Sequence, residues 1–156
     1  MRFTNNGLEI FLPDNLFEEL CLHAREHYPN EFGGFLIGKY LDDRKTASVT
    51  KCILPKKYQG RPTLFERSTK GLEGEFKRIF AEEGEYYLGE WHTHPNGSAN
   101  YSTTDLNAMK NIAECTSVTI ANPLLLIIAV TSKNITGQTF YHYENQKLTA
   151  YEQNRP

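Results

Sequence analysis

Four residues that can bind a metal or transfer a proton lie close together in GEWHTHPNGSANYSTTDL, residues 89–106. His92 and His94 are separated by one residue, so on a strand both imidazoles point to the same face. Ser102 and Asp105 follow three residues apart, which makes them neighbours on the surface of a helix. Two imidazole nitrogens and one carboxylate oxygen can bind Zn²⁺ and leave its fourth position open, as in catalytic sites.

The same residues also allow a purely structural interpretation. Ser102 can cap a helix whose first turn contains Asp105, where the helix dipole favours a carboxylate. Two histidines separated by one residue are also common by chance. Taken together, a histidine pair at the end of a strand and an acid at the start of the next helix favour a shared metal site.

The spacing H-x-H-x7-S-x2-D resembles the JAMM motif of MPN-plus (Mov34/PAD-1-type) metalloproteases. That motif also contains an upstream glutamate in the form E-x-G-G/C-x-L-x-G, and this chain has EFGGFLIG from Glu31 to Gly38. The segment YLGEWHTHP is most similar to small stand-alone bacterial members, such as the deconjugating peptidases of cyclic-oligonucleotide antiphage systems. The resemblance covers nearly the whole chain, so it implies a single JAMM domain over residues 1–156.

The resemblance implies a zinc-dependent peptidase or isopeptidase. His92, His94 and Asp105 would hold Zn²⁺, Glu31 would take and return the proton of the attacking water, and the Ser102 hydroxyl would donate to the developing oxyanion. The substrate would be a protein with an extended C-terminal tail, either ubiquitin-like or, in the antiphage systems, a conjugated nucleotidyltransferase. Such a tail can bind as an added strand at a sheet edge. A processing peptidase for a sulfur-carrier protein, a DNA-repair-associated JAMM protein and a non-catalytic MPN scaffold are the alternatives.

Several further residues need an interpretation. Glu90 shares a strand face with His92 and could orient a histidine, act as a rival base or be a surface carboxylate. His23 and His27 are four apart on a predicted helix without an HExxH motif, and we expect them on a solvated face. We expect His142 to be structural and Trp91 to point away from the metal into the core.

Hydrophobic periodicity indicates which elements position these residues. It predicts helices over 14–28, 71–83 and 103–115 and strands over 33–41, 46–54, 86–94, 124–131 and 138–144. The fold class is therefore α/β, an α+β mixed sheet flanked by helices, and the resemblance implies the MPN/JAMM fold, which is similar to that of cytidine deaminases. A deaminase itself is excluded because the chain has no P-C-x-x-C pair. Residues 55–69 are predicted to be irregular; with Arg61, Phe65 and Arg67 they are a candidate for substrate contact, as is the loop 96–101.

Composition excludes several other classes of protein. Of the 156 residues, 39% are hydrophobic and 23% charged, which is typical of a globular chain, and the net charge of −2 gives no indication of nucleic-acid binding. Three isolated cysteines argue against a disulfide framework and against a thiolate zinc site. The N-terminus does not resemble a secretion signal, and the longest apolar run is too short for a membrane span. We therefore expect a cytoplasmic protein without a membrane partner.

Overall fold

A large mixed sheet forms the centre of the molecule in the computed structural model, which describes residues 1–115, 120 and 122–154. Its strands are β1 (Arg2–Asn5), β2 (Leu8–Phe11), β3 (Gly33–Tyr40), β4 (Thr46–Ile53), β7 (Tyr86–Pro95), β8 (Leu124–Val130), β9 (Ile135–Glu144), β10 (Lys147–Ala150) and β11 (Glu152–Asn154). Within the described residues their order is β10-β9-β8-β7-β3-β4-β2-β1-β11. The pairs β7–β8 and β2–β4 are parallel and the other pairs are antiparallel.

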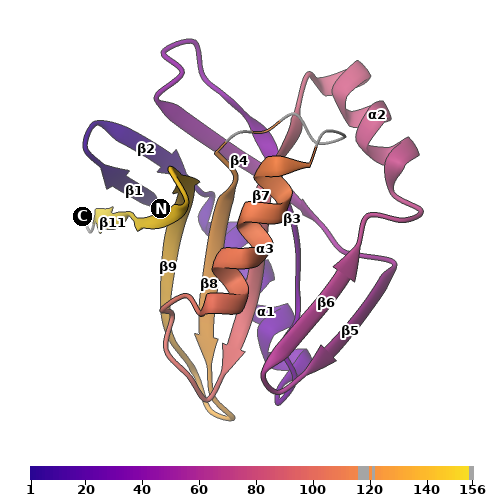
Figure 1. Ribbon diagram of the computed structural model, residues 1–156, viewed down its shortest axis with the longest axis vertical. Coiled ribbons are helices and arrows are strands. Elements are labelled where there is room, and N and C mark those ends of the chain that lie inside the picture. The colour runs from indigo at the N-terminus through magenta and orange to yellow at the C-terminus, as the bar shows by residue number, and fades with distance from the viewer. Residues whose placement is uncertain (116–119, 121, 155–156) are drawn as a thin grey trace.

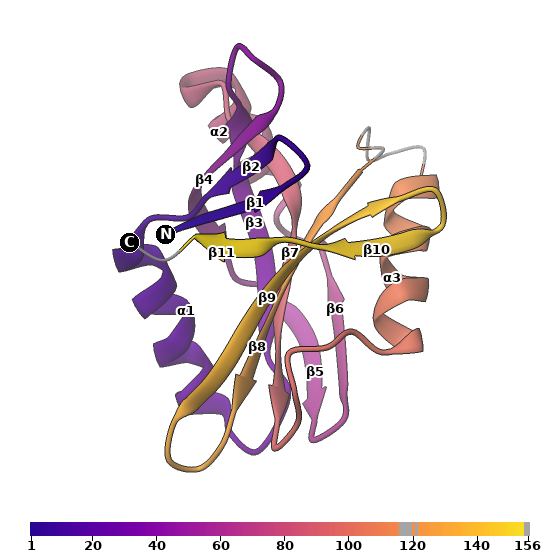
Figure 2. The same ribbon diagram turned by 90° about the vertical axis from the view of Figure 1, so that its left-hand side faces the viewer.

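Helices cover both faces of this sheet. They are α1 (Asp14–His27), α2 (Glu73–Glu83) and α3 (Thr103–Glu114), and Figure 2 shows α1 and α3 on opposite sides of the strands. Strand β8 lies between them, and each of its seven residues is buried, as predicted from its continuous apolar sequence. None of the helices in the described ranges is long and apolar enough to cross a membrane.

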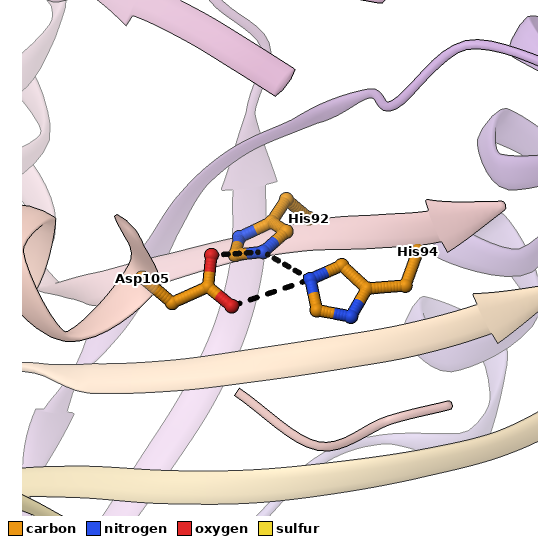
Figure 3. Close-up of side chains that lie close together, drawn as sticks. All are labelled: His92, His94 and Asp105. Carbon is orange, nitrogen blue, oxygen red and sulfur yellow. Dashed lines mark hydrogen bonds and ion pairs between the residues drawn. The ribbon is translucent and has the colours of Figure 1, made fainter. Parts of the chain in front are cut away.

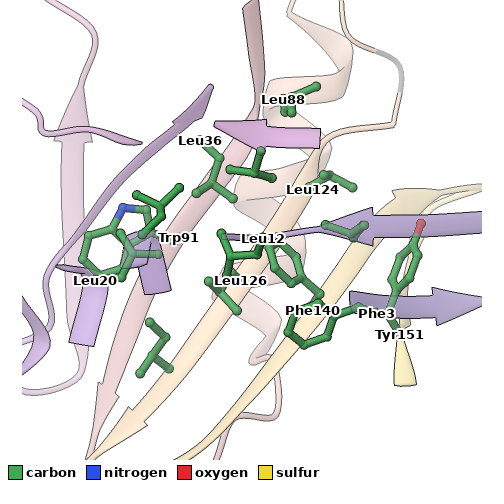
Figure 4. Packing of buried hydrophobic residues seen from close by; sticks show 14 of the residues in the cluster. Phe3, Leu12, Leu20, Leu36, Leu88, Trp91, Leu124, Leu126, Phe140 and Tyr151 are labelled. Carbon is green, nitrogen blue, oxygen red and sulfur yellow. The ribbon is translucent and has the colours of Figure 1, made fainter. Parts of the chain in front are cut away.

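The main core lies between α1 and the sheet. Leu20 of α1, Trp91 of β7, and Leu124 and Leu126 of β8 belong to it, and each is at most 2% exposed (Figure 4). Leu125 and Ile127 point to the other face, where they pack with Met109 of α3 in a second cluster. Trp91 therefore faces the core, as predicted, and its neighbours on β7 face α3.

The predicted helices and the five predicted strands are confirmed, with ends that differ by up to three residues. The prediction that residues 55–69 are irregular is wrong: β5 (Lys57–Arg61) and β6 (Leu64–Ser68) form a separate antiparallel hairpin beside the sheet (Figure 1). The short strands β1, β2, β10 and β11 were not predicted, because three or four residues carry too little alternation to be distinguished from a loop.

Candidate metal centre

His92 and His94 of β7 and Asp105 of α3 converge on one point (Figure 3). One potential ligand atom from each residue lies within 4.8 Å of the other two. The two Nε2 atoms are 3.1 Å apart, His92 Nε2 is 3.0 Å from Asp105 Oδ1, and His94 Nε2 is 3.3 Å from Asp105 Oδ2. The predicted grouping of two histidines with one acid is therefore present in the structure.

These distances fit a small divalent cation. Zn²⁺ binds nitrogen and oxygen at about 2.0–2.2 Å, and a tetrahedral arrangement of such bonds separates neighbouring ligand atoms by roughly 3.3 Å. The two Nε2 atoms are 3.1 Å apart, and each lies 3.0–3.3 Å from one of the two Asp105 oxygens, which is close to that value. Three protein donors would also leave a fourth position open. The residues present could therefore hold a metal ion with little rearrangement.

The two rings differ in protonation. Burial opposes the charge on His94, but hydrogen bonds to Asp105 and to the Ser98 carbonyl outweigh it and raise the pKa of this ring, so a metal ion must displace a proton there. His94 Nδ1 lies 3.0 Å from the carbonyl oxygen of Ser98, to which the ring N–H can donate; the lone pair of Nε2 is then directed at the cluster. Burial lowers the pKa of His92, so this imidazole is neutral at pH 7 and able to coordinate. Burial opposes ionisation of Asp105, but hydrogen bonds with both histidines hold its pKa well below the usual range. The carboxylate is therefore ionised.

Asp105 also caps the helix that carries it. Its Oδ2 accepts a hydrogen bond of 2.7 Å from the Ser102 backbone N–H, and its own N–H donates to Ser102 Oγ at 3.1 Å. This is a reciprocal capping box at the start of α3. Ser102 and Asp105 therefore do cap the helix, as the structural interpretation predicted. Asp105 also lies beside the two histidines, so the two interpretations hold at once.

Glu31 lies just before β3 and is held by its backbone. The next residue, Phe32, donates from its N–H to Thr93 Oγ1 at 3.0 Å and accepts from the Thr93 N–H at 2.8 Å. The Glu31 N–H itself donates to the carbonyl of Arg61 at the end of β5, at 2.8 Å. A Cβ on Gly60 would lie 2.3 Å from the Glu31 carbonyl oxygen, so glycine is required for this approach. Both β7 and the hairpin therefore position Glu31.

Burial raises the pKa of Glu31 to about 7, although the nearby charge of His94 opposes the rise. A carboxylate with such a pKa can accept and return a proton near neutral pH. The Gly33–Gly34 pair allows close backbone packing: a Cβ on Gly33 would lie 2.0 Å from the Trp91 carbonyl oxygen. The strand after Glu31 can thus pair with β7 at the level of His92.

A small cavity of about 30 Å³ lies beside the cluster, and it is large enough for a water molecule. Its lining brings together Glu31, His92, Ser102 and Asp105, which the sequence motif had grouped. An open groove of about 400 Å³ lies next to it, between β6 and α3. Arg67 and Phe65 of β6 line both spaces, so the segment 55–69 does reach the candidate site.

Other candidate residues differ from expectation. The surface interpretation of Glu90 is wrong, because its side chain is 8% exposed and pairs with Arg67 and with the Tyr87 hydroxyl. The solvated face predicted for His23 and His27 is also wrong: both are half-buried, and the His27 ring stacks on Phe32 at 3.6 Å. The reason is that the segment before β3 packs under the end of α1.

The buried environment of His142 is formed in part by Tyr151, whose ring centroid is 5.3 Å from that of the imidazole. His142 Nε2 also lies 3.4 Å from a carboxylate oxygen of Glu144. The expectation that His142 is structural remains a prediction.

The loop 96–101 is attached to the rest of the structure by several hydrogen bonds. The Tyr141 hydroxyl donates to the Ala99 carbonyl, and the Tyr28 hydroxyl donates to Asn96 Oδ1.

Thr93 is the positioning residue that the sequence interpretation missed. Its position between two histidines on a strand placed it on the opposite face, which is correct, but its bonds to Phe32 are long-range. The available signal was that Thr93 shares a strand face with Trp91, which was predicted to enter the core, and a polar group buried there requires a partner.

The sequence is similar to that of known proteins. Residues 13–142 match the family model for prokaryotic homologs of the JAB domain. The chain is 31% identical over 120 residues to a "CD-NTase/cGAS isopeptidase" of Enterobacter hormaechei, covering 76% of this chain and 66% of that protein. It is 27% identical to a "probable metalloprotease y4qB" of Sinorhizobium fredii, covering 76% of this chain and 74% of that protein. The chain thus spans slightly under two thirds of the enterobacterial protein.

Solved structures have the same fold. Protein DSY2949 from Desulfitobacterium hafniense superposes with a TM-score of 0.70 at 22% identity, covering 92% of this chain and 90% of that chain. A protein from Salinibacter ruber superposes with a TM-score of 0.55 at 19% identity, covering 92% of this chain and 87% of that chain. At these identities the likeness concerns the fold alone. The match over residues 13–142, which contain the cluster and Glu31, shows that this chain belongs to the family of prokaryotic homologs of the JAB domain.

Proposed function

We propose that this protein is a zinc-dependent isopeptidase or peptidase that cleaves the bond after the extended C-terminal tail of a conjugated protein. The observation that supports this most strongly is the cluster itself, beside a cavity that Glu31 also lines. Its two imidazole Nε2 atoms lie 3.1 Å apart, and each lies 3.0–3.3 Å from one oxygen of the Asp105 carboxylate. His92, His94 and Asp105 would hold the ion. When bound, Zn²⁺ supplies Lewis acidity and makes water acidic enough to react near pH 7.

Glu31 is the proposed general base. Its carboxyl lines the cavity, and with a pKa of about 7 it can accept the proton of a water molecule and later donate it to the leaving amine. Ser102 is the proposed oxyanion donor. Its Oγ accepts the Asp105 N–H, which leaves its own O–H free to donate toward the cavity. Loss of one such donor typically lowers the rate by about 10²–10³-fold.

The groove between β6 and α3 is the proposed binding site for the tail. Strand β6 pairs with β5 along one edge, and the described residues pair no further strand with its other edge. Together with Thr104, Asn107 and Ala108 of α3, β6 lines the open groove beside the cavity. An extended tail can add to such an edge through main-chain hydrogen bonds, while the side chains of α3 contact its residues. Its terminal carbonyl would then lie at the metal cluster.

A CD-NTase, a nucleotidyltransferase joined through its C-terminus to lysine side chains, is the substrate that we favour. The basis is the similarity to the CD-NTase/cGAS isopeptidase of Enterobacter hormaechei, which is 31% identical to this chain. A ubiquitin-like sulfur-carrier precursor and a DNA-repair conjugate are the alternative substrates. A non-catalytic scaffold is disfavoured because each of the five motif positions holds the residue type that catalysis requires.

The proposed function is tested with reporters that carry a C-terminal tail of about ten residues joined to a lysine side chain or to a peptide amine. We expect zinc-dependent cleavage of the isopeptide reporter with a CD-NTase tail, abolished by a chelator and by Glu31→Gln. Glu75→Gln, which changes an exposed carboxylate on α2 outside the groove, is the matched control. Cleavage that persists after chelation, or that Glu31→Gln leaves intact, contradicts the mechanism; cleavage of a sulfur-carrier tail alone would reassign the substrate.

A further inference from the structure

A buried ion pair attaches the hairpin to the central sheet next to the metal cluster. Arg67 Nη2 of β6 contacts Glu90 Oε2 of β7, and the two side chains are 17% and 8% exposed. The Tyr87 hydroxyl lies 3.4 Å from the other Glu90 oxygen. Arg67 Nη1 also lies 3.5 Å from the Phe65 carbonyl oxygen. The guanidinium is thus held in one orientation from two sides (hairpin in Figure 1).

Arg67 lines both the small cavity and the groove between β6 and α3. It therefore lies at the passage from the groove, where we place the substrate tail, to the cluster, where we place the scissile bond. Glu31, Ser102 and Asp105 also line the cavity, and Ser102 is the proposed donor to the scissile carbonyl alone. The carbonyl groups of the tail that precede it therefore need a separate donor on the approach.

The chemistry of the guanidinium meets this need. Arginine has five N–H donors in a planar fork and no acceptor. The contacts to Glu90 and Phe65 use Nη2 and Nη1 but leave other N–H groups of the guanidinium able to donate. Peptide carbonyl oxygens are the acceptors that an extended chain presents in regular order. A guanidinium fixed by a buried carboxylate loses little further side-chain entropy when it binds such an oxygen.

We propose that Arg67 binds main-chain carbonyl groups of the substrate tail beside the scissile bond, and that Glu90 is its positioning residue. This inference rests on the proposed function. Glu90 acts through Arg67: it holds the guanidinium at the junction of groove and cavity, and does not itself contact the tail. Arg67 is thus a specificity-determining residue that selects an extended backbone over a folded surface.

The test compares Arg67→Met, Glu90→Leu and the double variant. Arg67→Met leaves a buried carboxylate without its cation and is expected to lower stability, whereas an apolar pair of similar volume restores it. The probe is the CD-NTase tail peptide of about ten residues without a scissile bond, its binding measured by calorimetry on the zinc-loaded protein. We expect the dissociation constant to rise about tenfold or more in Arg67→Met and in the double variant alike.

Zinc content and catalysis separate a binding role from a structural one. We expect each variant to retain stoichiometric zinc, and the KM for the isopeptide reporter to rise more than kcat falls. Arg67→Lys, which keeps the charge and loses the fork, should weaken binding less than Arg67→Met. Lys57→Met, which removes an exposed cation from the same hairpin, is the control.

A double variant that recovers both stability and wild-type peptide affinity would overturn the inference, because the pair would then be only a structural link. Should Arg67→Met fail to fold, the double variant still decides the question. Wild-type protein that binds the peptide and zinc but cleaves no reporter would refute the proposed function alone, since the comparison of affinities remains valid.

Discussion

Replacing Glu31 by glutamine should make the metal-free protein more stable at alkaline pH. Burial raises the pKa of this carboxyl from 4.5 to about 7, so the folded chain holds a proton that the unfolded chain has released. Between these two values the folded state binds more protons, and its stability therefore falls as pH rises. One unit of pKa shift corresponds to about 1.4 kcal/mol, so ionisation of Glu31 lowers the free energy of unfolding by up to about 3 kcal/mol.

Glu31 is half-buried, and solvent screening reduces this figure, so we expect a gain of about 1–3 kcal/mol for Glu31→Gln at pH ~8. At pH ~4.5 most of the gain should be absent, because the folded wild type is then protonated and the unfolded chain is half protonated. The charge of Glu31 helps to raise the pKa of His94, so its removal offsets part of the gain wherever that imidazole is protonated.

Urea denaturation of chelator-treated wild type and variant at the two pH values measures the difference. A gain of this size corresponds to a rise in Tm of roughly 2–10 °C for a chain of this length. Glu66→Gln serves as the control, because it removes an exposed carboxylate from β6. Equal stability of wild type and Glu31→Gln at both pH values would refute the idea that burial raises this pKa.

Four further predictions concern the site and its support. His94→Ala should lose bound zinc, measured by atomic emission, while the circular dichroism spectrum stays native. Asp105→Ala should lower the free energy of unfolding of the metal-free protein by about 1–2 kcal/mol through loss of the helix cap, and Asp105→Asn by less, as urea denaturation would show. Gly60→Ala places a Cβ 2.3 Å from the Glu31 carbonyl oxygen, so reporter cleavage should slow with zinc content unchanged. Trp91→Ala should lower the free energy of unfolding by about 3–5 kcal/mol in thermal or chemical denaturation, since this side chain is 1% exposed.

The sequence was sufficient for those parts of the site that depend on local periodicity. Strand alternation placed His92 and His94 on one face, and helical spacing placed Ser102 beside Asp105. The short connection 95–101 then limits how far the helix start can lie from the end of the strand. These constraints act within about fourteen residues, which is why they could be predicted without a model of the whole fold.

The contacts made by the hairpin could not be predicted in this way. Its strands contain Gly60 and flank Pro62, so their composition resembles a loop, and nothing local shows that Arg67 pairs with Glu90 twenty-three positions later. The environment of His27 was misjudged for the same reason, because its partner Phe32 reaches it only after the chain turns. Ion pairs and ring contacts between distant segments depend on tertiary packing.

The capping box at α3 makes substitutions at the site unequal in their effect on folding. Replacing Glu31 removes a carboxyl whose charge burial disfavours, so a chain without this proposed base would be more stable near neutral pH. Replacing Asp105 removes the capping box and destabilises the first turn of α3, the helix whose Met109 packs against β8. If the proposed function holds, a related chain that loses activity would lose the proposed base Glu31 before the proposed ligand Asp105, and the cluster would outlast catalysis.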